Sequence, residues 1–231
     1  MWLFKSSVGR KVIMSVTGLA LVLFLTFHMS MNCVAIISPE SYNMICATLG
    51  ANWYAVVASI ALAGLMIIHI IYALLLTLQN RRARGANRYV VNYRPKGVEW
   101  SSKNMLVLGV VVLLGLALHL LNFWYRMQFA ELVGNHEIAT SIAGVESPSD
   151  GVGLIRYTFS KWYYVLFYIV WLVALWMHLN HGFWSALHTL GASNNKWLCR
   201  IRVISTVVTT IIIVGFALVV FFYFANHLLI A

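Results

Sequence analysis

The chain contains few charged residues and very few acidic ones. Charged residues make up 10% of its 231 residues, and only six are Asp or Glu. A soluble domain usually has about a quarter of its residues charged and about half of them apolar, whereas 61% of this sequence is hydrophobic. The composition therefore excludes an ordinary soluble domain and predicts a membrane protein.

Cysteine is also scarce. The three cysteines include no Cys-x-x-Cys pair, so the chain does not bind an iron–sulfur cluster of the familiar spacing. Cys33 and Cys46 fall near the outer membrane surface, where a disulfide is permitted, and Cys199 falls on the reducing cytoplasmic side. Spacing alone does not decide whether Cys33 and Cys46 are bridged, so both states stay open.

Long apolar runs dominate what is present. About 20 residues of helix cross the apolar core of a bilayer, and a helix satisfies its own backbone hydrogen bonds in lipid. The first run is too long for a cleaved signal peptide. We predict an all-α membrane protein with one domain over 1–231 and its first four helices in an up-down bundle. The five predicted transmembrane helices cover about 11–36, 52–79, 104–127, 161–189 and 203–228.

The connectors on one side of the predicted helices are short or built of turns. Pro39 ends the first helix, and residues 37–51 read as a short loop. The longer connector 128–160 contains SPSDGVG, which predicts turns. A short helix is expected near 127–133.

Positive charge is concentrated on the opposite side. Thirteen of the sixteen Lys and Arg residues lie near the N-terminus, between the second and third helices, or between the fourth and fifth, whereas five of the six acids lie in the other connectors. This positive-inside distribution places the N-terminus in the cytoplasm and the C-terminus outside. Topology and anionic lipid explain the net charge of +10, which therefore does not indicate a nucleic-acid partner.

Each of the first four predicted helices carries one histidine deep in its apolar run: His28, His69, His119 and His178. Intramembrane ionisable side chains are costly and usually functional. His28 and His119 lie nearer the outside and His69 and His178 nearer the cytoplasm, with a difference in depth of roughly 5 to 10 Å. Alternate helices of an up-down bundle are diagonal neighbours, so each pair can reach one central group.

A haem fits each pair, because two neutral imidazoles from opposite sides complete the axial ligands of one iron. A six-coordinate haem has no open position for oxygen and transfers electrons instead. The second N–H of each ring can donate to a backbone carbonyl of its own helix, which would fix the orientation of the ring. Small residues on the same helices would admit a flat macrocycle or a neighbouring helix: Gly18, Gly64, Gly115 and Gly182.

Other interpretations of the histidines were weighed against haem. A lone intramembrane histidine more often bonds a neighbouring helix or lines a proton path. Two histidines without a nearby cysteine or carboxylate make a poor zinc or copper site. His181 is three residues from His178 and could replace it as a ligand. His188 fits either a haem propionate contact or a solvated interface, and His136 and His227 have no predicted ligand role.

Two stretches resemble the cytochrome b subunit of succinate dehydrogenase and fumarate reductase. SSVGRKVIMSVTGLALVLFLTFHMSMN at 6–32 resembles its first helix, and HLNHGFWSALHTLG at 178–191 resembles its fourth, with the pattern His-x-x-x-Gly-aromatic. The first histidine of that pattern is His178, which favours it over His181. The five-helix layout is similar to the single-subunit, two-haem branch, and the resemblance extends over the whole chain.

The resemblance implies a multi-pass anchor in the bacterial inner membrane that binds a flavoprotein subunit and an iron–sulfur subunit on the cytoplasmic side. It implies two haem b groups, the cytoplasm-side one held by His69 and His178 and the distal one by His28 and His119. Electrons would pass between the iron–sulfur subunit and a quinone, usually menaquinone. The chain itself would not act on the dicarboxylate. The direction of the reaction and a dimer of complexes are both left open.

The resemblance places the quinone near the distal haem, beside a hydrogen-bonding group. The candidates are Asn32, Glu40, Asn43, Asn122 and Trp124. Some members have a glutamate inside the fourth helix, but no predicted span here contains an acidic residue. This difference argues against an intramembrane carboxylate relay.

Two further functions stay open at this point. The first is the haem subunit of another membrane dehydrogenase, although cytochromes of the bc type place two ligands on one helix and no span here has such a pair. The second is a transporter that relays protons through histidines, which broken helices and a polar pathway would favour.

Overall fold

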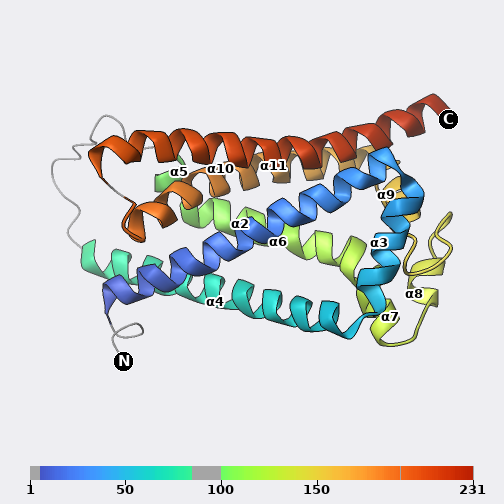
Figure 1. Ribbon diagram of the computed structural model, residues 1–231, viewed down its shortest axis with the longest axis horizontal. Helices are drawn as coiled ribbons and strands as arrows, with labels where there is room; N and C mark the ends of the chain where they lie inside the picture. Colours follow the sequence, from blue (N-terminus) through green and yellow to red (C-terminus); the bar gives the residue numbers. More distant parts are fainter. Residues whose placement is uncertain (1–5, 85–99, 193, 231) are drawn as a thin grey trace.

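The computed structural model describes residues 6–84, 100–192 and 194–230, and it is almost entirely helical over these ranges. Five long helical stretches run along the longest axis of the molecule (Figure 1). They are α2 (Ser7–Ile37), α4 (Trp53–Arg84), α6 (Met105–His119) continued by η1 (Leu120–Phe129), α10 (Trp162–Thr189) and α11 (Asn195–Ile230). Each is long and apolar enough to cross a bilayer. The chain is therefore an all-α, multi-pass membrane protein, as predicted.

The helices extend beyond the predicted spans at several ends. The second runs to Arg84 rather than to about residue 79, and the fifth begins at Asn195 rather than at about 203. Apolar periodicity marks only the part of a helix that faces lipid or core, and a helix can continue into water beyond it. The described part of the connector between the second and third spans adds a short helix, α5 (Trp100–Lys103), and residues 85–99 lie outside the described residues.

The expected loop at 37–51 is wrong, because these residues form α3 (Pro39–Ala51). Ser38 ends one helix and begins the next. Its backbone N–H donates to the Val34 carbonyl at 2.8 Å, and its hydroxyl accepts from the Ser41 N–H at 3.2 Å. Pro39 stops α2, as predicted, but a proline is also well suited to the first position of a new helix. The chain therefore turns and restarts instead of forming a loop.

The connector 128–160 is also more helical than expected. It contains α7 (Ala130–Leu132), α8 (Glu137–Thr140) and α9 (Gly151–Phe159). The α7 helix matches the short helix predicted near 127–133. SPSDGVG was predicted as turns, but Asp150 is the N-cap of α9 and accepts from the Gly153 N–H at 2.9 Å. An aspartate followed closely by glycines is typical both of a turn and of a helix N-cap. Here the apolar residues after Gly153 pack against the core, which favours the helix.

These short helices gather at one end of the molecule (Figure 1). Asn43 joins α3 to α9: its side-chain amide donates to Asp150 at 2.9 Å and its carbonyl accepts from the Val152 N–H at 3.0 Å. We call this end, formed by α3, α7, α8 and α9, the capped end. The opposite end, formed by residues 6–11, 79–84, 100–105, 189–192 and 194–203, carries most of the described Lys and Arg residues, and we call it the basic end.

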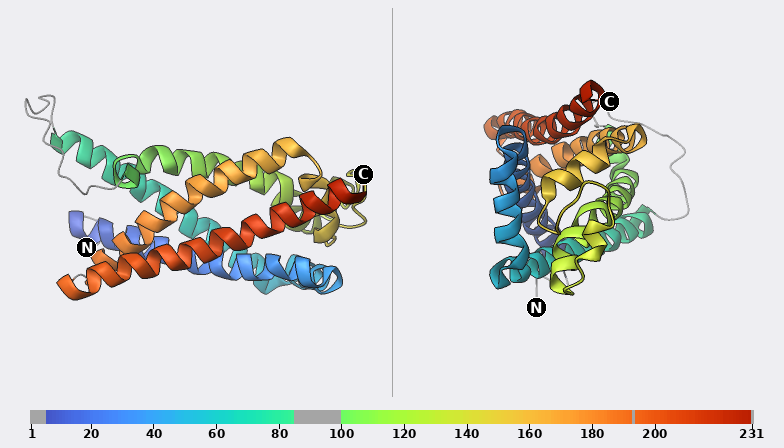
Figure 2. Two further views of the ribbon diagram at one scale, coloured as in Figure 1. Left: turned by 90° about the horizontal axis from the view of Figure 1, so that it is seen from above. Right: turned by 90° about the vertical axis from the view of Figure 1, so that its right-hand side faces the viewer.

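Helix α2 is central to the packing. It contacts α4, α10 and α11, and α10 in turn contacts α2, α6 and α11. Figure 2 shows α11 along the side of the molecule, against α2 and α10. The main apolar core lies toward the capped end and includes Tyr42, Ile155, Phe159, Tyr168 and Tyr223. A second, smaller core of Leu172, Leu175 and Leu179 lies further along α10.

Large apolar side chains cover the outside of all five long helices. Those more than half exposed include Leu23, Ile60, Val107, Leu166 and Leu218. Helix α4 is the least covered, because no residue in its apolar 18-residue window is buried. Such a surface is stable in a lipid environment and would aggregate in water.

Candidate functional site: two pairs of histidines

The four intramembrane histidines meet in two pairs inside the helices. The ring centres of His28 on α2 and His119 on α6 are 5.8 Å apart, with the ring planes at 82°. The ring centres of His69 on α4 and His178 on α10 are 6.5 Å apart, with the planes at 67°. These are the two pairings that depth in the sequence predicted. None of the four side chains is exposed.

The two pairs lie at different levels along the helices. His69 reaches Thr17 on α2, whereas His28 lies eleven residues further along the same helix. At 1.5 Å per residue this offset is roughly 16 Å. His119 contacts Trp171 on α10, seven residues before His178, an offset of roughly 10 Å. Measured along the helices, the separation between the two pairs thus lies at or above the upper end of the roughly 5 to 10 Å expected.

The pair near the capped end is enclosed by aromatic rings. Phe24 stacks on His28 at 5.4 Å from one turn earlier on α2, and Phe216 of α11 approaches it at 5.6 Å. Around His119 the ring centres of its neighbours lie 5.2 to 6.4 Å away; these neighbours are Phe123, Trp171 and Tyr168. This lining is apolar and excludes water from the imidazoles.

Gly115 lets Trp171 reach His119. A Cβ atom built on Gly115 would overlap the indole ring of Trp171, so any other residue would displace the ring. The indole N–H donates to the Val112 carbonyl at 3.1 Å, which fixes the ring between α6 and α10. Gly115 was predicted to admit a macrocycle or a helix, and the structure shows a tryptophan from the neighbouring helix at this position.

The helix widens into π-helical turns directly after His119. This stretch, η1, covers Leu120–Phe129 and brings Asn122 into the interior, where its amide donates to the Tyr168 hydroxyl at 3.3 Å. Wider turns of this kind often occur at functional positions. The sequence contains no proline or glycine in this stretch. The π-helical turns could therefore not be predicted from the sequence.

The pair near the basic end has polar neighbours instead of aromatic ones. The hydroxyl oxygen of Thr17 lies 3.2 Å from Nδ1 of His69. A Cβ atom on Gly18 would lie 3.3 Å from Cε1 of the same ring. Among the described residues, the buried Nδ1 of His178 has no hydrogen-bond partner. A buried unpaired ring nitrogen is costly, and it makes this pair a candidate site.

For three of the four rings, Nδ1 has no backbone carbonyl of its own helix as a partner among the described residues. His69 Nδ1 faces Thr17 of the adjacent helix, and His178 Nδ1 has no partner among the described residues. His28 Nδ1 lies 3.4 Å from the Asn32 amide nitrogen, which is long for a hydrogen bond.

The donor set of each site is two imidazoles. No group of three His, Cys, Asp or Glu residues gathers anywhere in the described ranges, and a structural zinc ion takes four ligands. A metal–imidazole bond is about 2 Å long and the ring centre lies roughly 1 Å further, so two rings on opposite sides of one iron have centres about 6 Å apart. Both pairs have this spacing. Gly64 and Gly182 have no neighbouring atom within 4 Å where a Cβ would stand, among the described residues.

The remaining four histidines are not members of the two pairs. His181 packs edge-on against Trp184 at 5.1 Å, whereas the ring that pairs with His69 is that of His178. His188 is exposed at the basic end. His136 is exposed and lies 3.7 Å from Glu131 at the capped end, and His227 is exposed on α11.

The five predicted quinone contacts are divided between the capped-end pair and the cap itself. Asn32 accepts from the Tyr42 hydroxyl at 3.2 Å and donates to the His28 carbonyl at 2.8 Å. With Asn122, it is the candidate nearest the histidines. Asn43 is engaged between α3 and α9, and Glu40 is exposed and accepts from Ser38 at 3.3 Å. Trp124 is exposed and donates to Gln128 at 2.9 Å.

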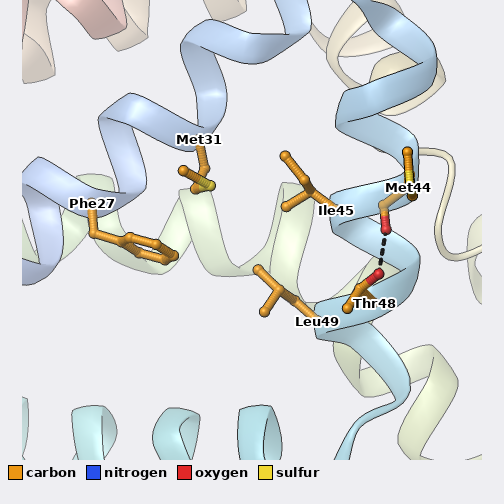
Figure 3. A pocket seen from close by; sticks show the side chains of 6 residues that line it. All are labelled: Phe27, Met31, Met44, Ile45, Thr48 and Leu49. Atoms are coloured by element: carbon orange, nitrogen blue, oxygen red, sulfur yellow. Dashed lines mark hydrogen bonds between the residues drawn. The ribbon is translucent and has the colours of Figure 1, made fainter.

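An apolar pocket of about 250 Å³ opens between α2 and α3 (Figure 3). Phe27 and Met31 line it from α2, one residue before and one turn after His28. The α3 side is Met44, Ile45, Thr48 and Leu49. The Thr48 hydroxyl donates to the Met44 carbonyl at 2.8 Å, so its proton is not available to a ligand.

All three cysteines are free. The Cys33 thiol lies 3.6 Å from the Met29 sulfur on the α11 side of α2, whereas Cys46 packs where a Cβ on Gly151 would stand. Burial raises the pKa of Cys46 to about 11, which makes its thiol unreactive at neutral pH. The disulfide left open by the sequence is absent.

No protein-family model, curated protein or solved structure matches this chain. Its function is therefore inferred from the residues and contacts described above.

Proposed function

We propose that the chain is the two-haem cytochrome b subunit that anchors a succinate dehydrogenase or fumarate reductase in the membrane. The observation that carries the proposal is the pairing of His28 with His119 and of His69 with His178 at two levels of one helical core. Paired imidazoles with no third ligand in the described residues favour a haem over a zinc or copper ion.

In this proposal each histidine pair holds one haem b. A bound haem with two imidazole ligands supplies one-electron transfer and has no open position for oxygen. The protein holds the imidazoles in apolar surroundings, and the aromatic rings around His28 and His119 keep water from them. The open space beside Gly64 and Gly182 would accommodate a flat macrocycle.

The charge distribution supports an orientation with the basic end in the cytoplasm of a bacterium. The described cations there include Arg10, Lys11, Arg81, Arg200 and Arg202. On this orientation the N-terminus is cytoplasmic and the C-terminus lies outside. The flavoprotein and iron–sulfur subunits would bind at the basic end, next to the haem of His69 and His178. The connector between the second and third transmembrane helices also contains Arg88, Arg94 and Lys96, which lie outside the described residues.

The quinone would bind at the capped end, near His28 and His119, and would be menaquinone in this class of protein. Asn32 and Asn122 are the polar groups closest to that pair. The apolar pocket between α2 and α3 adjoins the same level of α2. Both asparagine amides already donate hydrogen bonds, so a quinone oxygen would compete with the His28 carbonyl for Asn32 and with the Tyr168 hydroxyl for Asn122.

The first experiment is a reduced-minus-oxidised absorption spectrum of the chain purified together with its soluble partner subunits. We expect b-type bands and a pyridine-haemochrome content of two haems per chain. Succinate or fumarate turnover with a menaquinone analogue then tests the partners and the acceptor. A spectrum without b-type bands overturns the proposal and leaves a proton-relaying transporter to be tested.

Orientation has its own test. Cys199 is exposed at the basic end, whereas Cys33 and Cys46 are only partly exposed. We expect a membrane-impermeant maleimide to label the protein in inverted membrane vesicles and not in intact spheroplasts. Cys199→Ser is the control, because it should remove the label. Labelling from outside the spheroplast would reverse the orientation.

A further inference from the structure

Thr17 is the polar side chain that faces His69 from the neighbouring helix. Its hydroxyl oxygen lies 3.2 Å from Nδ1 of His69. Thr17 is only 4% exposed, and α2 and α4 pack against each other. The contact therefore lies inside the protein, where a hydrogen bond is stronger than in water and is not exchanged for one to solvent.

The direction of this hydrogen bond follows from the other partners of the hydroxyl. Thr17 Oγ1 lies 2.9 Å from the Ile13 carbonyl and 3.1 Å from the Met14 carbonyl, and a carbonyl can only accept. A hydroxyl has a single proton and two lone pairs. Its proton is engaged with its own helix, so toward His69 the hydroxyl accepts. Nδ1 of His69 must then carry the proton, which leaves the lone pair on Nε2.

Gly18 sets the position of the same ring. A Cβ atom at residue 18 would lie 3.3 Å from Cε1 of His69, which is tighter than ordinary van der Waals contact. The ring is thus held at Nδ1 by Thr17 and limited at the adjacent carbon by Gly18. His178 differs, since its Nδ1 has no partner among the described residues and a Cβ on Gly109 would make only an ordinary contact of 3.8 Å.

We propose that Thr17, with Gly18 beside it, is a positioning residue that fixes the proton of His69 on Nδ1 and presents Nε2 to the basic-end haem iron. The inference rests on the proposed haem-binding function and adds to it the group that sets the tautomer of one ligand. A hydrogen bond donated by the outer nitrogen makes an imidazole a more basic ligand, which favours ferric over ferrous iron. The basic-end haem therefore has a lower midpoint potential than it would have without Thr17.

Redox titration of the purified complex tests this with three variants. Thr17→Val keeps the shape and removes the acceptor, Thr17→Ser keeps the hydroxyl, and Thr26→Val is the matched control. Thr26 is also on α2 and its hydroxyl makes the same bond to a carbonyl four residues earlier, at 2.9 Å. We expect Thr17→Val to raise the potential of one haem. Loss of an outer-shell partner typically changes metal affinity 10-fold or more, and about tenfold in the ferric-to-ferrous ratio is about 59 mV for one electron.

The potential of the second haem should not move, Thr17→Ser should restore the first, and Thr26→Val should leave both unchanged. Two haems with unchanged potentials in Thr17→Val overturn this inference and leave the proposed function standing. An equal shift in Thr26→Val overturns it as well, because the effect would then belong to the helix and not to the contact. A wild-type complex without haem overturns the proposed function and this inference together.

A second pair of variants decides the matter where Thr17→Val does not assemble. Gly18→Ala pushes on the His69 ring, and Gly109→Ala makes the same chemical change beside the His178 ring of the same pair with ordinary contact only. We expect Gly18→Ala to alter the low-spin ferric EPR signal of one haem and Gly109→Ala to leave both signals as in the wild type. Unaltered EPR signals in both variants overturn the inference.

Discussion

The two histidine pairs are chemically alike but are held in different ways. At the capped end, aromatic rings from α10, α11 and η1 pack on His28 and His119, and no polar side chain of the described residues makes a hydrogen bond with His119. At the basic end, Thr17 holds His69 by a hydrogen bond, and His178 Nδ1 has no partner among the described residues. Packing places a ring without choosing its proton, whereas a hydrogen bond does both. The two sites should therefore respond to different substitutions.

The largest expected effect is the loss of one haem from either site without loss of the other. His178→Ala should remove the basic-end haem and His119→Ala the capped-end haem, because each leaves a single imidazole at one level. Haem content should fall from two to one in both variants. Redox titration should find one midpoint potential in each variant, and the two potentials should together match those of the wild-type complex. Retention of both haems in His178→Ala would point to His181 as the ligand.

The next effect separates packing from hydrogen bonding. Gly115→Ala places a Cβ atom inside the space of the Trp171 indole, so the tryptophan or the helix must shift, at a cost of about 1–3 kcal/mol. The capped-end haem should be lost or spectrally altered while the basic-end haem stays normal. Absorption and EPR spectra of the purified variant measure this. Equal disturbance of both haems would mean that the two sites are not mechanically separate.

A smaller effect is expected from the cap itself. Asp150 accepts from the Gly153 N–H, from the Asn43 amide and from the Glu146 N–H. Asp150→Ala removes the N-cap of α9 and should cost about 1–2 kcal/mol. A lower thermal midpoint with both haems retained is the expected result, and Glu137→Ala, at an exposed position of the same end, is the control. Loss of the basic-end haem in Asp150→Ala would contradict the comparison.

The smallest effect is expected at Trp184. Its ring contacts His181, and the Arg202 guanidinium lies 4.5 Å from the ring centre. Among the described residues, the ring makes no ring contact with the four paired histidines. An exposed cation–π contact stabilises by about 0.5–1 kcal/mol. Trp184→Ala should therefore keep two haems per chain by the pyridine-haemochrome assay. A missing haem would reveal a packing role for this ring at the basic end.

Helical spacing could have found part of the site that the sequence analysis missed. Thr17 lies eleven residues before His28, which is close to three full turns, so the two share a face of α2. That places a hydroxyl toward the interior but does not say which ring it meets. Trp171 is likewise one of several aromatic residues on α10, and its contact with Gly115 depends on how closely α6 and α10 approach.

Helix limits at the capped end show why local signals were ambiguous. Ser38 and Pro39 mark a stop for α2 and a start for α3, and the same residues read as a loop when only the stop is considered. The π-helical turns after His119 have no breaker in the sequence. They bring Asn122 to Tyr168, and that contact involves residues from separate helices.

The sequence by itself determined the five apolar helices, the excess of positive charge at one end and the levels of the four histidines, because lipid imposes length, charge side and depth on each helix separately. Only the tertiary structure decided that His69 meets Thr17, that Trp171 fills the space at Gly115 and that residues 39–51 form a helix across the capped end. These features depend on the rotation and crossing of helices against one another. Such geometry is fixed by contacts between distant residues, which no single helix encodes.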